Sequence, residues 1–270
     1  MLTFIDHILT FLLIVGLPLY GAIEYRRLKA RRAKQRAQGL KPEAPEYHWT
    51  IAIQWGLTAV MICIWLWHGY PWRDLGVTMP PDRSLWSGWG FIVIAVLTLA
   101  LVVMQIRQNA TVRRSASTRE KIRGQIASVL DLLPSSRREL HWFYGLSLTA
   151  GVCEELLYRG WMLWYLSHSM NMWIAVALSA VIFGVAHSYQ GVGGIIKTGL
   201  VGLVVGLMYA ISGSLWLPML LHAAVDVLSG RMAFDVLTMD RDGAPIPGEG
   251  ERSSPLRYDQ PHASAGPSAA

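Results

Sequence analysis

Long apolar stretches alternate with short polar ones along most of this chain. A helix of about 20 apolar residues crosses the hydrocarbon core of a bilayer, and stretches of roughly that length recur. The apolar pattern therefore predicts an all-α, polytopic membrane helical bundle with about seven transmembrane helices. These helices are predicted at residues 2–23, 49–68, 87–106, 141–167, 171–188, 194–211 and 214–230.

Composition agrees with a membrane protein and excludes an ordinary soluble domain. Hydrophobic residues make up 53% of the 270 residues and charged residues only 16%, whereas soluble domains carry about 25% charged residues. The first apolar stretch lacks a basic region before it and an obvious small-residue cleavage site. We therefore expect it to be a retained span rather than a removed signal.

Basic charge gathers in two of the segments between the spans. Residues 25–41 and residues 107–140 each contain eight Lys or Arg, and such segments stay on the cytoplasmic side of a membrane. We therefore expect the N-terminus outside, both basic loops inside, and anionic lipids as their partners. No nucleic-acid motif accompanies this charge, so nucleic acid is not an expected partner. No organellar signal is visible, and we expect a bacterial inner membrane.

Two segments outside the spans have patterns of their own. Residues 231–270 are rich in Pro, Gly, Ser and Ala, which predicts a disordered cytoplasmic tail. The second basic loop predicts a short helix that either lies on the inner membrane surface or packs on protein as a connector, and the sequence leaves both open. Its apolar face would consist of Ile122, Ile126, Val129, Leu130 and Leu133.

The later spans carry ionisable side chains, while the second and third spans carry almost none. A charged group at bilayer depth costs several kcal/mol unless it is paired or faces a polar cavity, so it is a candidate functional residue by default. The candidates are Glu154, Glu155 and Arg159 in the fourth span, His187 of the fifth, which lies four residues after Phe183 in "FGVAH", and His222 and Asp226 in "HAAVD" of the seventh.

Helical spacing separates the roles of these residues. Glu155 and Arg159 are four apart with the acid first, which is the favourable order for an ion pair. Glu154 is rotated by about 100° from Glu155 around the helix and has no local cation, which suits it to act as a general base. His222 and Asp226 share one helical face, where the carboxylate could fix the tautomer of the imidazole or share its hydrogen-bond network.

Each of these features has a structural explanation when taken alone. The Glu155–Arg159 pair could simply stabilise its helix, His187 could sit at the membrane interface, and His222 with Asp226 could clamp two helices together. Their combination on three spans is harder to explain in this way. It predicts a shared polar cavity within the bilayer.

The ordered motifs EExxxR, FxxxH and HxxxD resemble those of the CAAX prenyl protease and bacteriocin-processing family of intramembrane proteases, which includes the Ras-converting CAAX protease type. They read "EELLYR" at 154–159, "FGVAH" at 183–187 and "HAAVD" at 222–226, and the likeness covers roughly residues 141–230. Any one motif is weak, whereas all three in order, each on its own span, are fairly specific.

The resemblance implies a role for each residue of the three motifs. Glu154 and His187 would activate the attacking water, and His222 and Asp226 would contact the scissile carbonyl or stabilise the oxyanion. Glu155, Arg159 and Phe183 would support the site.

Asp226 stands where the CAAX-cleaving members usually carry Asn. An ionised Asp cannot donate a hydrogen bond to an oxyanion. We therefore expect Asp226 to be protonated, to act through His222, or to accept from another group. The departure also leaves open whether the substrate is a prenylated CAAX protein.

A metal ion is a further open question. Glu154, His187 and His222 could supply one oxygen and two nitrogens to a catalytic zinc ion, and the family has been described as metalloproteases. The HExxH signature is absent. The metal thus remains unknown, and we favour a metal-free glutamate mechanism because Glu154 cannot easily be both ligand and base.

The sequence thus predicts an intramembrane endopeptidase that acts on membrane-anchored peptides or proteins. Residues 1–140 would form N-terminal transmembrane helices and basic loops, residues 141–230 a CAAX-protease-like catalytic core, and residues 231–270 the tail. One alternative is a proton-coupled transporter, which predicts inverted repeats and broken helices that we do not find clearly. Another is a non-catalytic membrane protein of the bacteriocin-immunity kind.

Overall fold

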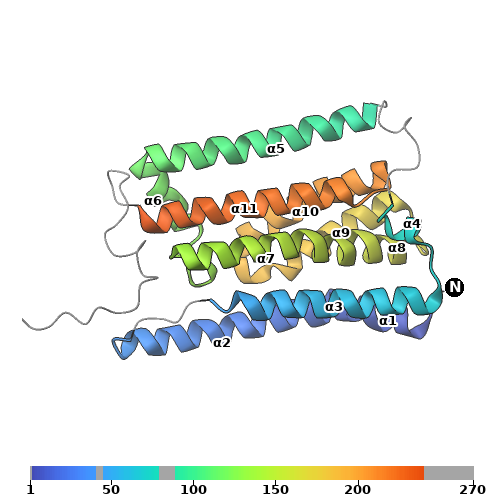
Figure 1. Cartoon of the computed structure of the whole chain (residues 1–270), viewed down its shortest axis with the longest axis horizontal. Coiled ribbons are helices and arrows are strands. Elements are labelled where there is room, and N and C mark those ends of the chain that lie inside the picture. The colour runs from blue at the N-terminus through green and yellow to red at the C-terminus, as the bar shows by residue number, and fades with distance from the viewer. Residues whose placement is uncertain (1, 41–44, 79–88, 240–270) are drawn as a thin grey trace, which may run out of the picture.

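The computed structural model describes residues 2–40, 45–78 and 89–239. Every element assigned within these residues is a helix, and the long helices run side by side along the long axis of the molecule (Figure 1). The predicted all-α membrane bundle is confirmed.

Helical segments occupy all seven of the predicted stretches. The first stretch contains α1 (Phe4–Phe11), the π-helical η1 (Leu12–Gly16) and α2 (Leu17–Ala37), which follow one another without a break. Five other stretches each contain one long helix: α3 (Tyr47–His68), α5 (Trp89–Arg114), α9 (Met172–Ala186), α10 (Val192–Ser212) and α11 (Trp216–Thr238). The fourth predicted stretch contains α7 (Arg137–Glu155), the π-helical η4 (Leu156–Trp161) and α8 (Met162–Ser167). Short helices join them at α4 (Trp72–Leu75), α6 (Ala116–Gln125), η3 (Leu130–Leu132) and η5 (Ser188–Gln190).

Three helices in the described part of the chain are both long and apolar enough to cross a membrane. They are the continuous helix Phe4–Ala37, α3 and α10, while α9 is apolar but shorter. The protein is thus an integral membrane protein, and the number of about seven crossings stays a prediction.

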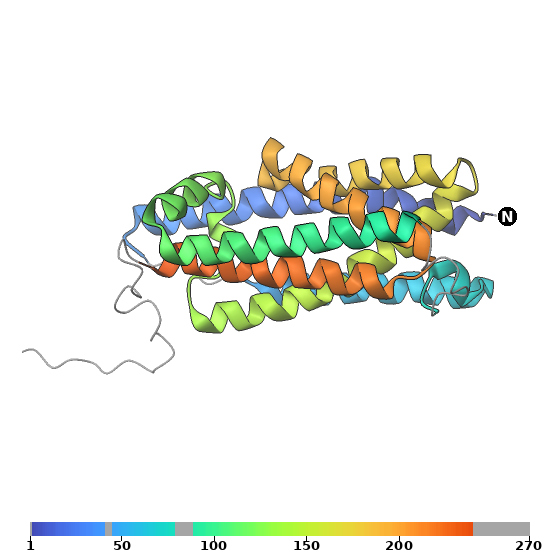
Figure 2. The same ribbon diagram turned by 90° about the horizontal axis from the view of Figure 1, so that it is seen from above.

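Both basic segments lie at the same end of the bundle. The C-terminal end of α2, the short helix α6 and the first turn of α7 all lie at this end, and the N-terminus lies at the opposite end (Figures 1 and 2). This arrangement agrees with the expectation that both segments face one side of the membrane. The segment at 25–41 is not a loop, however, because α2 continues to Ala37. Arg, Lys, Ala and Gln are good helix formers, so the helix does not stop where the apolar pattern does.

The predicted amphipathic helix of the second basic loop is only partly formed. Helix α6 ends at Gln125, so the five apolar residues expected on one face do not share a helix. Gly124 and Ser128 are poor helix formers, which explains an early end. Ile122 packs against Val112, Met232 and Val236. At this residue the segment is a connector packed on protein rather than a helix laid on the membrane.

The C-terminal boundary of the bundle also differs from the prediction. Helix α11 runs to Thr238, and Met232, Ala233, Phe234 and Val236 are buried. The predicted tail boundary at residue 231 is therefore wrong. The residues from Arg231 to Thr238 still have a helix-compatible, largely apolar composition, and the Pro- and Gly-rich composition begins only after them. The rest of the predicted tail, 240–270, lies outside the described residues.

Two glycines allow the helices that carry the predicted site to approach closely. A Cβ atom added at Gly151 of α7 would lie 2.7 Å from Ala223 Cβ of α11, and one at Gly184 of α9 would lie 2.7 Å from the Ile195 carbonyl oxygen of α10. Such distances are shorter than van der Waals contact, so a larger residue would separate the helices. Small residues have this function in membrane helix packing generally.

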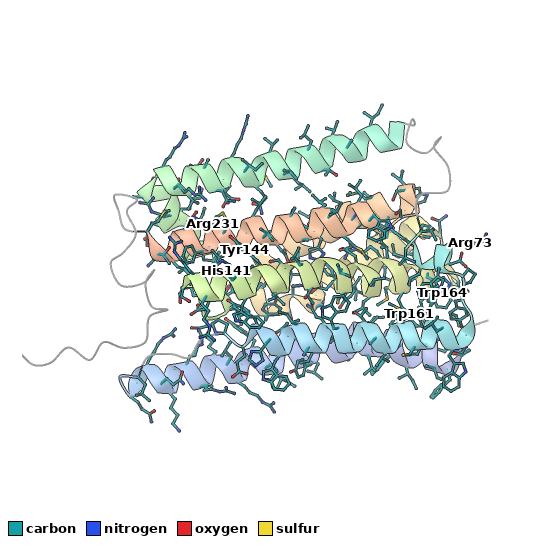
Figure 3. The ribbon with its side chains drawn as sticks, in the orientation of Figure 1. Arg73, His141, Tyr144, Trp161, Trp164 and Arg231 are labelled. Atoms are coloured by element: carbon teal, nitrogen blue, oxygen red, sulfur yellow. The ribbon has the colours of Figure 1, made fainter. Side chains whose placement is uncertain are left out.

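An aromatic cluster fixes the far end of the α7–η4–α8 segment. The ring centroids of Trp65 and Trp164 lie 5.0 Å apart, and those of Trp65 and Trp161 lie 6.1 Å apart. Figure 3 shows Trp161 and Trp164 near one end of the bundle, well away from His141, Tyr144 and Arg231 at the basic end. The polar residues of the predicted site belong to the helical stretch between these two ends.

Candidate active site

Glu154 lies near the end of α7 and uses its two carboxylate oxygens differently. Oε1 accepts a hydrogen bond of 2.8 Å from Nε2 of Gln54 in α3. Oε2 is buried and has no hydrogen-bond partner. A buried carboxylate oxygen without a partner is uncommon in folded proteins and calls for an explanation.

Two imidazoles face this unpaired oxygen. Nε2 of His187, in the residue that caps α9, and Nε2 of His222 in α11 each lie 4.0 Å from Glu154 Oε2. The three side chains come from three separate helices and are only 8–18% exposed. The predicted convergence of Glu154, His187 and His222 is therefore confirmed.

The opposite nitrogen of each imidazole is engaged by an acceptor. His187 Nδ1 lies 2.8 Å from the carbonyl oxygen of Phe183, and His222 Nδ1 lies 2.7 Å from Glu155 Oε1. A carbonyl or carboxylate oxygen only accepts hydrogen bonds, so Nδ1 donates in both residues. In both residues it is therefore the Nε2 atom that faces Glu154 Oε2.

Residues 136–228 match a family model described as type II CAAX prenyl endopeptidase Rce1-like. This segment is Rce1-like. The family resemblance predicted from the three motifs is thus confirmed, and the family is one of CAAX proteases, which are hydrolases. No curated protein and no solved structure matches the chain.

The Rce1-like segment begins one residue before α7 and ends within α11, so it contains all seven residues predicted for the site. Among them, Glu155 and Arg159 form an ion pair of 2.8 Å and are no more than 1% exposed. Arg159 Nη2 also donates to the carbonyl oxygen of Gly202 at 3.1 Å, and its guanidinium lies 4.4 Å above the Phe183 ring. The predicted pairing of Glu155 with Arg159 is confirmed.

Glu155 has a second contact that the spacing did not predict. The sequence suggested that Asp226 fixes the tautomer of His222, but it is Glu155 that holds His222 Nδ1. Asp226 Oδ2 instead lies 3.7 Å from His222 Nε2, on the side facing Glu154, and its side chain is 38% exposed. Helical spacing correctly placed Asp226 beside His222. It did not indicate the contact with Glu155, because spacing describes contacts within one helix, whereas this contact joins α7 to α11.

Arg159 lies within the π-helical segment η4, which interrupts the helix directly after Glu155. Short π-helical segments are frequent at functional sites. The motif "EELLYR" contains no Pro or other residue that would predict a π-helical segment from the sequence. Packing between helices stabilises such a wide turn, and a single-sequence pattern does not record that packing.

Gln54 is the residue of the site that the sequence did not identify. It lies outside the Rce1-like segment, in the second span, where the sequence predicted almost no chemically useful groups. A signal was present, since Gln54 is the only amide in the apolar run from Ile51 to Leu57. A single amide in a span is nevertheless a weak indication of function.

The predicted donors for a zinc ion are of a suitable chemical type. In the residues that the structure describes, however, no three or more His, Cys, Asp and Glu side chains are grouped so as to hold a metal ion. The two Nε2 atoms both lie 4.0 Å from Glu154 Oε2. A metal ion on this carboxylate would have to bind Oε2, because Oε1 is already bonded to Gln54.

Proposed function

We propose that the protein is an intramembrane endopeptidase that hydrolyses membrane-anchored peptides or proteins with a water molecule activated by Glu154 and His187. The observation that carries the proposal is the buried, unpaired oxygen of Glu154, which faces the Nε2 atoms of His187 and His222 at 4.0 Å. A polar contact of that length is often bridged by water. The two O–H groups of one water would donate to Glu154 Oε2 and His187 Nε2.

The reaction then follows the usual course of general acid–base catalysis. Glu154 takes a proton from the water while the water oxygen bonds to the scissile carbonyl carbon. The tetrahedral intermediate collapses, the C–N bond breaks, and the leaving amine takes the proton back from Glu154. Both proton transfers therefore use one carboxylate, and the products are a new carboxyl group and a new amine.

His222 would stabilise the oxyanion that forms in the first step. Glu155 holds its Nδ1 at 2.7 Å, and Asp226 lies 3.7 Å from its Nε2. An imidazolium held between these two carboxylates can donate from Nε2 to a developing negative charge. On this proposal Asp226 acts through His222, so Asn is not required at this position.

The substrate would be anchored in the membrane close to the basic end of the bundle. The basic segments at that end would face the cytoplasm of a bacterial inner membrane and contact anionic lipids. A prenylated CAAX protein is one substrate class, as the family suggests. A peptide of the kind processed with bacteriocins is another.

Cleavage by the purified protein in detergent tests the proposal. The probes are a prenylated CAAX peptide and a set of single-span peptides with short extensions, and mass spectrometry would locate the cleaved bond. We expect hydrolysis of a peptide bond in at least one probe. No cleavage of any probe, together with no peptide accumulating in cells that carry Glu154→Gln, would return the protein to the transporter or non-catalytic explanations.

Removal of metal ions is expected to leave this cleavage unchanged. The proposed base needs a free lone pair on Glu154 Oε2, which a bound zinc ion would occupy. Turnover is measured before and after dialysis against 1,10-phenanthroline, and the metal content of the same sample is determined by elemental analysis. Activity that is lost on dialysis and restored by zinc would contradict the metal-free mechanism.

A further inference from the structure

Gln54 connects the N-terminal helices to the proposed base. Its Nε2 atom donates to Glu154 Oε1 at 2.8 Å, and the next residue, Trp55, donates from Nε1 to Thr149 Oγ1 at 3.3 Å. Helix α3 thus holds α7 by two neighbouring side-chain hydrogen bonds. The one from Gln54 reaches a residue of the catalytic cluster.

This hydrogen bond determines which carboxylate oxygen is available. Because Oε1 of Glu154 is bonded to Gln54, Oε2 is the oxygen that faces His187 and His222. Without the amide, the carboxylate would be free to rotate about its last side-chain bond and present either oxygen. Small displacements of a catalytic group from its reactive position reduce turnover strongly.

Helix packing alone does not account for this amide. The other polar atom of Gln54, Oε1, is buried without a hydrogen-bond partner. A residue kept only to join two helices would be satisfied at both ends or replaced by an apolar side chain. An amide that is half satisfied and bonded to the unpaired acid of the cluster indicates a role in holding that acid.

We infer that Gln54 is a positioning residue, which fixes the Glu154 carboxylate so that Oε2 faces the two imidazoles. This inference rests on the proposed function, because it assigns Gln54 a part in the same reaction. It also extends the site beyond the Rce1-like segment, to a helix of the N-terminal part of the chain.

The test compares Gln54→Met with a matched variant elsewhere in the membrane. Methionine has nearly the shape of glutamine but no N–H donor. Gln105 in α5 is also buried, and its Nε2 donates to Ser229 Oγ at 2.8 Å, outside the cluster. Gln105→Met therefore removes a hydrogen bond of the same kind and length without touching Glu154.

We expect Gln54→Met to lower kcat for probe cleavage roughly 10- to 100-fold, the effect of losing one hydrogen bond to a charged group. KM should change by less than about twofold, because Gln54 acts on the base rather than on substrate binding. Gln105→Met should keep the wild-type kcat. Gln54→Glu should lose more activity than Gln54→Met, because two adjacent carboxylates would share a proton. Gln54→Asn keeps a shorter donor and should retain more activity than either.

The outcomes separate this inference from the proposed function. If the wild type cleaves a probe, Glu154→Gln does not, and Gln54→Met has a wild-type kcat, the proposed function stands and the positioning role is wrong. Equal losses of kcat in Gln54→Met and Gln105→Met would also overturn it, since a merely structural role predicts that result. If Gln54→Met does not fold, the order of the Asn and Glu variants decides. A wild type that cleaves no probe overturns both proposals.

Discussion

Glu154→Gln is expected to lower kcat for peptide cleavage by roughly 10²- to 10⁴-fold, the usual contribution of a general base. Glutamine has the size of glutamate but cannot take the proton from water. Its side-chain carbonyl oxygen can still accept the hydrogen bond that Gln54 donates to Glu154 Oε1 at 2.8 Å in the wild type. We therefore expect the variant to fold and to unfold at nearly the wild-type temperature in detergent. The measurements are single-probe kinetics and a thermal unfolding curve on one preparation.

The neighbouring acid provides the control. Glu155→Gln changes a residue that holds Arg159 at 2.8 Å and His222 at 2.7 Å. It should lose both activity and thermal stability, whereas Glu154→Gln should lose activity alone. A Glu154→Gln variant with more than about a tenth of wild-type kcat would remove Glu154 from the role of base.

The helices of this bundle could be predicted from the sequence because burial in a membrane demands long apolar runs. The errors in the predicted helix boundaries lie where a helix ends at a different residue from the apolar pattern. Helix α2 continues to Ala37 through basic residues that favour helices, and α11 continues to Thr238. Helix α6 instead ends early, at Gln125.

The convergence of Glu154, His187 and His222 could be predicted for a related physical reason. Ionisable groups are so costly within a bilayer that several of them on separate spans are expected to share one polar site. Contacts between helices could not be predicted in the same way. The sequence did not indicate that Glu155 holds His222, or that Gln54 reaches Glu154, since each contact depends on which helices are neighbours.

Loss of the buried ion pair between Glu155 and Arg159 is expected to lower the stability of the protein strongly. Arg159→Leu should lower the free energy of unfolding by about 3–5 kcal/mol, because it removes one partner of a buried ion pair. Both side chains are no more than 1% exposed. The variant also loses the hydrogen bond to Gly202 and the contact over the Phe183 ring. Cleavage should fall as well, since Glu155 positions His222.

An exposed ion pair of similar length serves as the control, because it separates the effect of burial on stability from the effect of the ion pair itself. Arg27 and Glu24 form an ion pair of 2.7 Å, but their side chains are 67% and 39% exposed. Arg27→Leu should therefore change the free energy of unfolding by no more than about 1 kcal/mol. Arg159→Lys keeps the charge but not the planar guanidinium, and it should fall between the two. Equal stability of Arg159→Leu and Arg27→Leu in one denaturant series would mean that burial adds nothing to the contribution of the Glu155–Arg159 pair.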